Sequence, residues 1–342
     1  MNSRKTFNKS IFATLLLICF ICAVFFIVSV NVDHMTTDAC FDTLDDATVE
    51  AASMVRASVE NDREQLNVIA DLLSQHDIHD IKTIKSHLAS FRQRGTLSSI
   101  GLLLPDNQLI LGMEEENIPE IALDYNTELK KAPYISGITN AADNTGKKFI
   151  YQAIPMEKDG QTTGILYGFV DLADFSDSIS TIAYDGNVQI YVADGETGDF
   201  LVDTWHDELG NIYDADIWIR KVKPGYDFHE MKTDFAEGKS GHIAFWSNTA
   251  GEYFYSCYMP VGIDRWMIQI TVLESVAFAK AIQVRKVMIL VAALELLTFP
   301  YILYGYSTRH EMTPTRKISS LRRSFICMMC SRLYLTRIKI LT

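Results

Sequence analysis

The chain has 342 residues, 48% of them hydrophobic and 22% charged, which is enough apolar material for a folded core and excludes wholesale disorder. The 43 acidic residues outnumber the 31 Lys and Arg residues, and the resulting net charge of −12 argues against a nucleic-acid-binding protein. Six cysteines are too few for a disulfide scaffold in a chain of this length.

The first predicted element is an apolar segment near the N-terminus. Ile11–Val30 contains twenty residues without a charge, and three basic residues precede it. At ~1.5 Å per residue, a helix of this length spans a hydrocarbon core of ~30 Å. A cleaved signal peptide is the alternative, but its apolar region is normally ~7–15 residues long. We therefore predict an uncleaved transmembrane helix over residues 11–31, after a cytoplasmic N-terminus at 1–10.

A long helix is expected to follow the first span. Apolar residues recur there mostly at spacings of three and four, and neither Gly nor Pro occurs from Asn31 to Arg94. These apolar positions are Leu44, Ala47, Ala51, Met54, Val55, Leu66, Ile69, Leu72 and Leu73. A second helix is predicted over Ile81–Phe91. Together the two helices would form a stalk over residues 32–95, able to carry a displacement from an outer domain to the membrane.

Two series of short strands follow the stalk, separated by turn residues. The first series is Leu97–Leu104, Gln108–Leu111, Tyr134–Thr139, Lys148–Met156 and Thr163–Asp171. The second series is Val188–Val192, Phe200–Asp203, Gly241–Trp246, Glu252–Met259 and Trp266–Val272. Their closing sections align with Pro155 on Pro260, which indicates an internal repeat. The prediction is an α+β fold with a membrane-distal unit at 96–180 and a membrane-proximal unit at 181–275.

A second apolar segment covers residues 287–306 and carries one acid, Glu295, and one proline, Pro300. A buried core helix is the alternative, but twenty residues is long for one. Basic residues gather at both ends of the chain, whereas the region between the apolar segments is acidic. The positive-inside rule then places both termini in the cytoplasm and residues 32–286 outside the cell. We expect a two-pass plasma-membrane protein with a short basic cytoplasmic tail at 307–342.

This organisation resembles the double-Cache extracytoplasmic sensor of bacterial transmembrane receptors. The resemblance rests on the order of span, long helix, two units and span, and on the blocks FIYQAIPMEKDGQTTGILYGFVDL and CFDTLDDATVEAASMVRASVENDREQLNVIADLL. Similar sensors occur in diguanylate cyclases and histidine kinases of Firmicutes. The resemblance covers roughly residues 33–286 and both spans. It implies tandem PAS-like units and a small-molecule sensor whose distal unit binds the ligand, and we expect a homodimer in the lipid bilayer.

The resemblance also indicates where a ligand would bind. Tyr134 matches the Tyr of the block that amino-acid-binding members carry before the third strand, and Asp171 matches their Asp at the end of the fifth strand. The Arg and Trp of that block are absent here. We add Ser136, Tyr151 and Tyr167, whose hydroxyls would contact a polar or cationic ligand at the mouth of an apolar cavity. The alternative is that the tyrosines are core residues with their hydroxyls at the rim.

No catalytic motif occurs in the sequence, and we expect no enzyme activity, no cofactor, no metal and no nucleic-acid partner. Only 36 residues follow the second span, too few for a cyclase or kinase domain. The expectation is a sensor without its own output, with a tail that is either a membrane-surface helix or the product of a frameshift. The alternatives are an N-terminal fragment of a diguanylate cyclase or histidine kinase, and a structural or adhesive surface protein.

Overall fold

A computed structural model describes residues 2–91, 95–112, 123–141, 146–179, 183–206, 209–214 and 221–310. The chain divides into two compact units. One is formed by residues 31–281, and the other by the flanking segments 1–30 and 282–342. The predicted tail from residue 311 onward lies outside the described residues.

The fold begins with one long helix of 73 residues, α1 (Asn2–Ser74). Among the residues that the structure describes, one helical segment is long and apolar enough to cross a membrane, and it begins at Ile18 in α1. Phe20, Phe26 and Ile27 of this segment are exposed, as lipid-facing residues would be. The second predicted span falls within α8 (Ala279–His310). That α8 crosses a membrane stays a prediction.

Residues 31–281 contain two antiparallel sheets. The elements of the first, which we call the distal domain, are α2 (Ile81–Ser90), β1 (Ser99–Leu103), β2 (Leu109–Leu111), α3 (Tyr125–Lys131), β3 (Tyr134–Ile135), β4 (Thr139–Asn140), β5 (Lys148–Lys158), β6 (Gln161–Asp171) and α4 (Leu172–Ser178). Those of the second, the proximal domain, are η2 (Ala183–Gly186), β7 (Val188–Asp194), β8 (Phe200–Asp203), α6 (Phe228–Glu237), β9 (Gly241–Ser247), β10 (Glu252–Pro260), β11 (Trp266–Leu273) and α7 (Glu274–Ala277).

The two sheets have the same strand order, β2-β1-β6-β5-β3 and β8-β7-β11-β10-β9, with β4 paired to β5 in the first. In each, the opening hairpin pairs with the last strand, and the last strand pairs with the one before it. The predicted α+β class and long helix are therefore confirmed. One predicted strand is wrong, because Tyr134–Thr139 forms two short strands, β3 and β4. The Ser136 hydroxyl accepts the N–H of Tyr151, which interrupts the backbone hydrogen bonding to β5.

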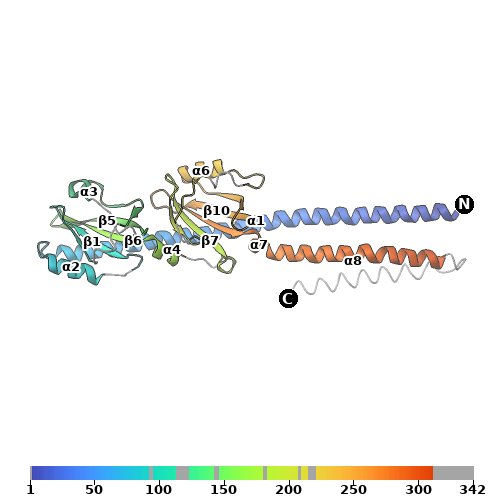
Figure 1. Cartoon of the computed structure of the whole chain (residues 1–342), viewed down its shortest axis with the longest axis horizontal. Helices are drawn as coiled ribbons and strands as arrows, with labels where there is room; N and C mark the ends of the chain where they lie inside the picture. The colour runs from blue at the N-terminus through green and yellow to red at the C-terminus, as the bar shows by residue number, and fades with distance from the viewer. Residues whose placement is uncertain are drawn as a thin grey trace. The chain divides into compact units, whose positions relative to one another are not determined.

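The C-terminal half of α1, from Cys40 to Leu73, packs against one face of both sheets. α3 and α6 lie over the opposite faces (Figure 1). The buried apolar residues of this half are Cys40, Phe41, Leu44, Ala47, Ala51, Ala52, Val55, Val59, Leu66, Ile69, Ala70 and Leu73. Most of the predicted stripe is thus confirmed, although Met54 and Leu72 are exposed. At Gly168 the helix comes so close that a Cβ would lie 2.7 Å from Leu66 Cδ1, so a larger residue there would have to displace that side chain.

The two sheets end differently. β6 ends at Asp171, whose side chain accepts the N–H of Ala173 at 3.0 Å and so caps α4. β11 ends at Leu273, which offers α7 no side-chain cap. Instead the Glu252 carboxylate, at the start of β10, accepts the N–H of Ser275 at 2.7 Å.

Candidate ligand-binding sites

The first candidate site lies on the face of the distal sheet that is turned away from α1. Because successive side chains of a strand point to opposite faces, Tyr151, Tyr167 and Phe169 share this face, whereas Gln152 and Gly168 face the helix. Their rings pack with centroids 5.6–6.2 Å apart. The result is a continuous aromatic floor.

α3 forms the cover of this floor. Its first turn is fixed by Asp124, whose carboxylate accepts the N–H of Thr127 at 2.9 Å and its hydroxyl at 2.7 Å. Tyr125 and Glu128, three residues apart, are then buried on one side of the helix. The Tyr125 hydroxyl reaches the carbonyl oxygen of Thr162 on β6 at 2.9 Å, which ties the helix to the sheet.

A buried carboxylate is the chemical centre of the site. Glu128 Oε2 accepts hydrogen bonds from the hydroxyls of Tyr134 and of Tyr167, the latter at 3.0 Å. Burial and the neighbouring carboxylate raise the pKa of both tyrosines well above the ordinary value, so both hydroxyls stay protonated and donate. Glu128 Oε1 meets the largely exposed Lys131 ammonium at 3.4 Å. The arrangement is an anionic group among aromatic rings, which is suited to an ammonium or guanidinium group.

The structure brings three of the five predicted residues together and separates the other two. Tyr134, Tyr151 and Tyr167 converge, with the Tyr134 and Tyr151 hydroxyls 3.4 Å apart. The Ser136 hydroxyl is used by the backbone, donating to Gly137 and accepting from Tyr151 at 2.8 Å each. The backbone therefore occupies its donor proton and one of its two acceptor lone pairs.

Asp171 lies on the same face but two positions beyond Phe169, whose ring stands between it and Tyr167. Its carboxylate forms an ion pair with Lys147 at 3.1 Å, in addition to capping α4. Asp171 therefore belongs to the border of the distal domain, where it lines an open groove with Asp203 and His206.

Sequence reasoning missed Glu128. It stands in a polar stretch that reads as a connection, DYNTELKK, between two strands. A signal was present, because Asp124 followed by Thr127 is a helix-start pattern that places Tyr125 and Glu128 on one face. The burial of the carboxylate depends on the tertiary position of that helix, which the pattern does not give.

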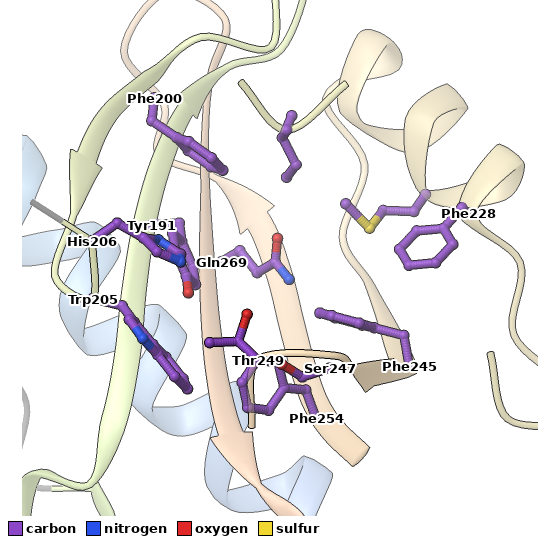
Figure 2. Close-up of a pocket in the computed structure, with 12 residues that line it drawn as sticks. Tyr191, Phe200, Trp205, His206, Phe228, Phe245, Ser247, Thr249, Phe254 and Gln269 are labelled. Atoms are coloured by element: carbon purple, nitrogen blue, oxygen red, sulfur yellow. The ribbon is translucent and has the colours of Figure 1, made fainter. Parts of the chain in front are cut away.

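The second candidate site is a cavity of about 90 Å³ in the proximal domain. It lies between the sheet and α6, on the face turned away from α1 (Figure 2). Its lining residues are Tyr191, Phe200, Trp205, His206, Ile212, Phe228, Met231, Phe245, Ser247, Thr249, Phe254 and Gln269. Figure 2 shows the Gln269 amide directed between the rings of Phe200 and Phe254. An apolar wall with a few polar groups is typical of small-molecule sites.

The rim of this cavity is held in place by a buried acid. Asp203 accepts the N–H groups of Trp205 and His206 at 2.9 and 3.0 Å, and its other oxygen pairs with His206 Nδ1 at 2.8 Å. The Trp205 ring meets Phe254 edge to face, with centroids 5.1 Å apart. Sequence reasoning placed ligand binding in the distal unit alone and did not find this cavity.

Comparison with known proteins shows the fold. No family model and no curated protein matches this chain. Among solved structures, it is similar to the extracellular domain of a protein described as histidine kinase mmHK1S-Z3, with 15% identity and a TM-score of 0.51 over 71% of this chain and 97% of that one. It is also similar to the ligand-binding domain of the Pseudomonas aeruginosa PAO1 amino acid chemoreceptor PctB in complex with L-Gln, with 18% identity and a TM-score of 0.50 over 70% and 93%. Over about 70% of its length, the chain has the fold of Cache-like sensor domains.

Proposed function

We propose that this chain is the input module of a two-pass plasma-membrane receptor, with both termini in the cytoplasm and a double-Cache, tandem PAS-like sensor outside the cell. The fold shared with extracellular sensor domains supports this proposal, as does the apolar segment of α1. In this proposal the described residues bind a signal molecule and catalyse nothing themselves. The reaction that responds to the signal would be carried out elsewhere, by a catalytic activity of the kind that diguanylate cyclases or histidine kinases provide.

The observation that carries the proposal is the buried Glu128 carboxylate at the aromatic floor of the distal domain. A buried charge is costly unless it is paired, and its ammonium partner, Lys131, is 56% exposed and 3.4 Å away. A small molecule with an amino or guanidinium group would pair better with Glu128, and the rings of Tyr134 and Tyr151 would stabilise its charge. The PctB domain, which shares the fold, holds L-Gln, a molecule with such an amino group.

The signal would travel along α1, which contacts both sheets. In the distal domain Gln152 Nε2 donates to the carbonyl oxygen of Val59 at 3.0 Å, and in the proximal domain Arg56 Nε donates to that of Val261 at 2.8 Å. A ligand that draws the distal sheet toward α3 would shift these contacts. In a homodimer, the two copies of α1 would then move by an ångström or two, which is enough for such transitions.

The test is a thermal-shift screen of the full chain in detergent with amines, amino acids and simple carboxylates. A bound ligand should raise the free energy of unfolding by RT ln(1 + [L]/Kd), which is about 2.7 kcal/mol at a hundredfold excess over Kd. An amine should raise the melting temperature, and Glu128→Gln should abolish the rise, whereas the exposed-acid control Glu157→Gln should leave it intact. Stabilisation by a ligand that is unaffected by Glu128→Gln would reject this site. Stabilisation by no compound would favour a structural or adhesive surface protein instead.

A further inference from the structure

A mixed cluster of donor atoms joins α1 to the edge of the proximal sheet, apart from both candidate ligand sites. Asp45 on α1 faces His242 on β9 and Cys257 on β10, which are register partners across the two strands. Asp45 Oδ1 lies 2.9 Å from His242 Nε2 and 2.6 Å from Cys257 Sγ. All three donor atoms lie within 4.8 Å of one another.

The surroundings of the cluster are asymmetric. Cys257 is buried, while the side chains of His242 and Asp45 are 38% and 44% exposed. The His242 ring is held against Phe41 with centroids 4.5 Å apart, so its Nε2 has a fixed direction. The cluster is therefore closed on the protein side and open on the solvent side.

We propose that Asp45, His242 and Cys257 bind one divalent transition-metal ion, with Zn²⁺ as the best chemical match. A thiolate, an imidazole and a carboxylate are the three ligand types that zinc takes, and a water on the open side completes four-coordination. Ligand atoms 2.0–2.3 Å from a tetrahedral ion lie about 3.3–3.8 Å apart. The two hydrogen bonds to Asp45 Oδ1 therefore need to widen by about 1 Å or less.

The proton balance is simple. On binding, the Cys257 thiol releases its proton to solvent and the thiolate bonds to the ion, while His242 binds as the neutral imidazole and Asp45 as the carboxylate. Burial and Asp45 raise the pKa of the thiol when no ion is present, so thiolate formation depends on the metal. Because the ligands come from α1 and from two strands, the ion would fix the helix against the proximal sheet.

Spacing in the sequence does not reveal this site. The ligands are separated by 197 and 212 positions from Asp45, and no two lie within one turn or one loop. No metal is accordingly expected from the sequence. The folded geometry is what brings the three ligands together, and this cluster is independent of the distal ligand site.

The test uses the full chain in detergent, freed of metal with a chelator, and with Cys327→Ser and Cys330→Ser so that the CxxC of the tail cannot bind metal. Titration with Zn²⁺ alone should give one ion per chain. Co²⁺ in its place should give the intense near-ultraviolet absorption of a cobalt–thiolate bond. His242→Ala and Asp45→Asn, both at exposed positions, should each weaken Zn²⁺ binding at least about 10-fold, since loss of even an outer-shell partner costs 10–100-fold. Cys257→Ser should remove the cobalt–thiolate absorption.

Two matched controls accompany these variants. His206→Ala removes a second His–Asp pair, at 2.8 Å, which belongs to no three-ligand group among the described residues, and Cys40→Ala removes a different buried cysteine, which lies on α1. Both should leave Zn²⁺ affinity unchanged. Less than one ion per chain, a cobalt–thiolate absorption that survives Cys257→Ser, or an equal loss on His206→Ala would each overturn the proposal. Glu128→Gln should not alter metal binding, so failure of this inference and failure of the proposed function are separate results.

Discussion

The guanidinium of Arg56, on α1, donates to the carbonyl oxygen of Val261 in the turn after β10, with the Nε–O distance at 2.8 Å. The next residue, Gly262, has a φ of +84°, and a Cβ there would lie 2.7 Å from Arg56 Nη2. The turn is thus shaped by the helix that it contacts. This contact joins α1 to the proximal sheet on the side where β10 turns into β11.

We predict that Gly262→Ala destabilises the protein more than the same substitution at a turn glycine whose added Cβ would contact no other atom. The left-handed backbone alone costs a residue with a Cβ about 1–2 kcal/mol, and displacement of Arg56 adds to it. Gly251→Ala is the matched control, because Gly251 also has a positive φ, +70°, with no atom within 4 Å. Urea unfolding of both variants measures the difference. In the double variant with Arg56→Ala the additional cost should disappear, and simple additivity would contradict this explanation.

A second prediction concerns the close approach of α1 to the distal sheet. Gly168→Ala would place a methyl group 2.7 Å from both Leu66 Cδ1 and Leu97 Cδ2, and overpacking of this kind costs about 1–3 kcal/mol. The melting temperature should fall accordingly. Gly137→Ala is the control, since Gly137 has no atom within 4 Å of the added Cβ and should stay within a few tenths of a kcal/mol. An equal fall in melting temperature in the two variants would contradict close packing of α1 on Gly168.

The tyrosines of the distal site provide a third prediction. Tyr167→Phe removes a hydrogen bond to the buried Glu128 carboxylate, whereas Tyr125→Phe removes one to the neutral carbonyl of Thr162. Hydrogen bonds to charged groups contribute about 1.5–3 kcal/mol, against about 0.5–1.5 for neutral ones. Chemical unfolding near pH 7 should therefore show the larger loss for Tyr167→Phe. An equal or smaller loss for Tyr167→Phe would contradict this explanation.

The fourth prediction is a pH dependence at Asp62. Burial raises the pKa of this carboxyl, and hydrogen bonds from the side chain and N–H of Thr96 oppose the shift only in part. A raised pKa means that the folded state holds the proton more tightly than the unfolded state does. Its contribution to stability is therefore present below the unfolded pKa and is lost as pH rises through the folded pKa.

Asp62→Asn keeps the shape of the side chain and removes the charge. The variant should gain melting temperature relative to the original chain at pH 7 and lose that advantage at pH 4. Asp174→Asn, at an exposed position, is the control and should show no such trend. A constant difference between pH 4 and pH 7 would exclude Asp62 as the titrating group.

The parts of this fold that the sequence predicts are those with local signals. The stripe from Leu44 to Leu73 has a helical period, and the strand pairs are separated by turn residues, so both were predicted. Tyr134 was assigned through the family resemblance, and Tyr151 and Tyr167 were added as hydroxyl groups over the sheet; the structure brings the three together. The position of Asp171 was not predicted, because residue type does not reveal that the Phe169 ring separates it from the tyrosines.

Non-local contacts account for what the sequence analysis missed. Glu128 is buried only because α3 lies over the sheet, and the proximal cavity combines residues of all five strands, β7 to β11, with residues of α6 and of loops. The Asp45 cluster joins a helix to two strands that follow it about 200 positions later in the sequence. Single-sequence patterns describe periodicity within an element, and such sites arise between elements.

The first turn of α7, which precedes α8, is capped by a side chain of β10. α4 carries its own starting hydrogen bond in Asp171, but α7 takes its own from Glu252, a residue of the sheet. If β10 slides, the Ser275 amide loses its acceptor and the first turn of α7 loosens. The first turn of α7, in the segment that leads into α8, is therefore held by a side chain of the neighbouring strand β10 and not by a cap of its own.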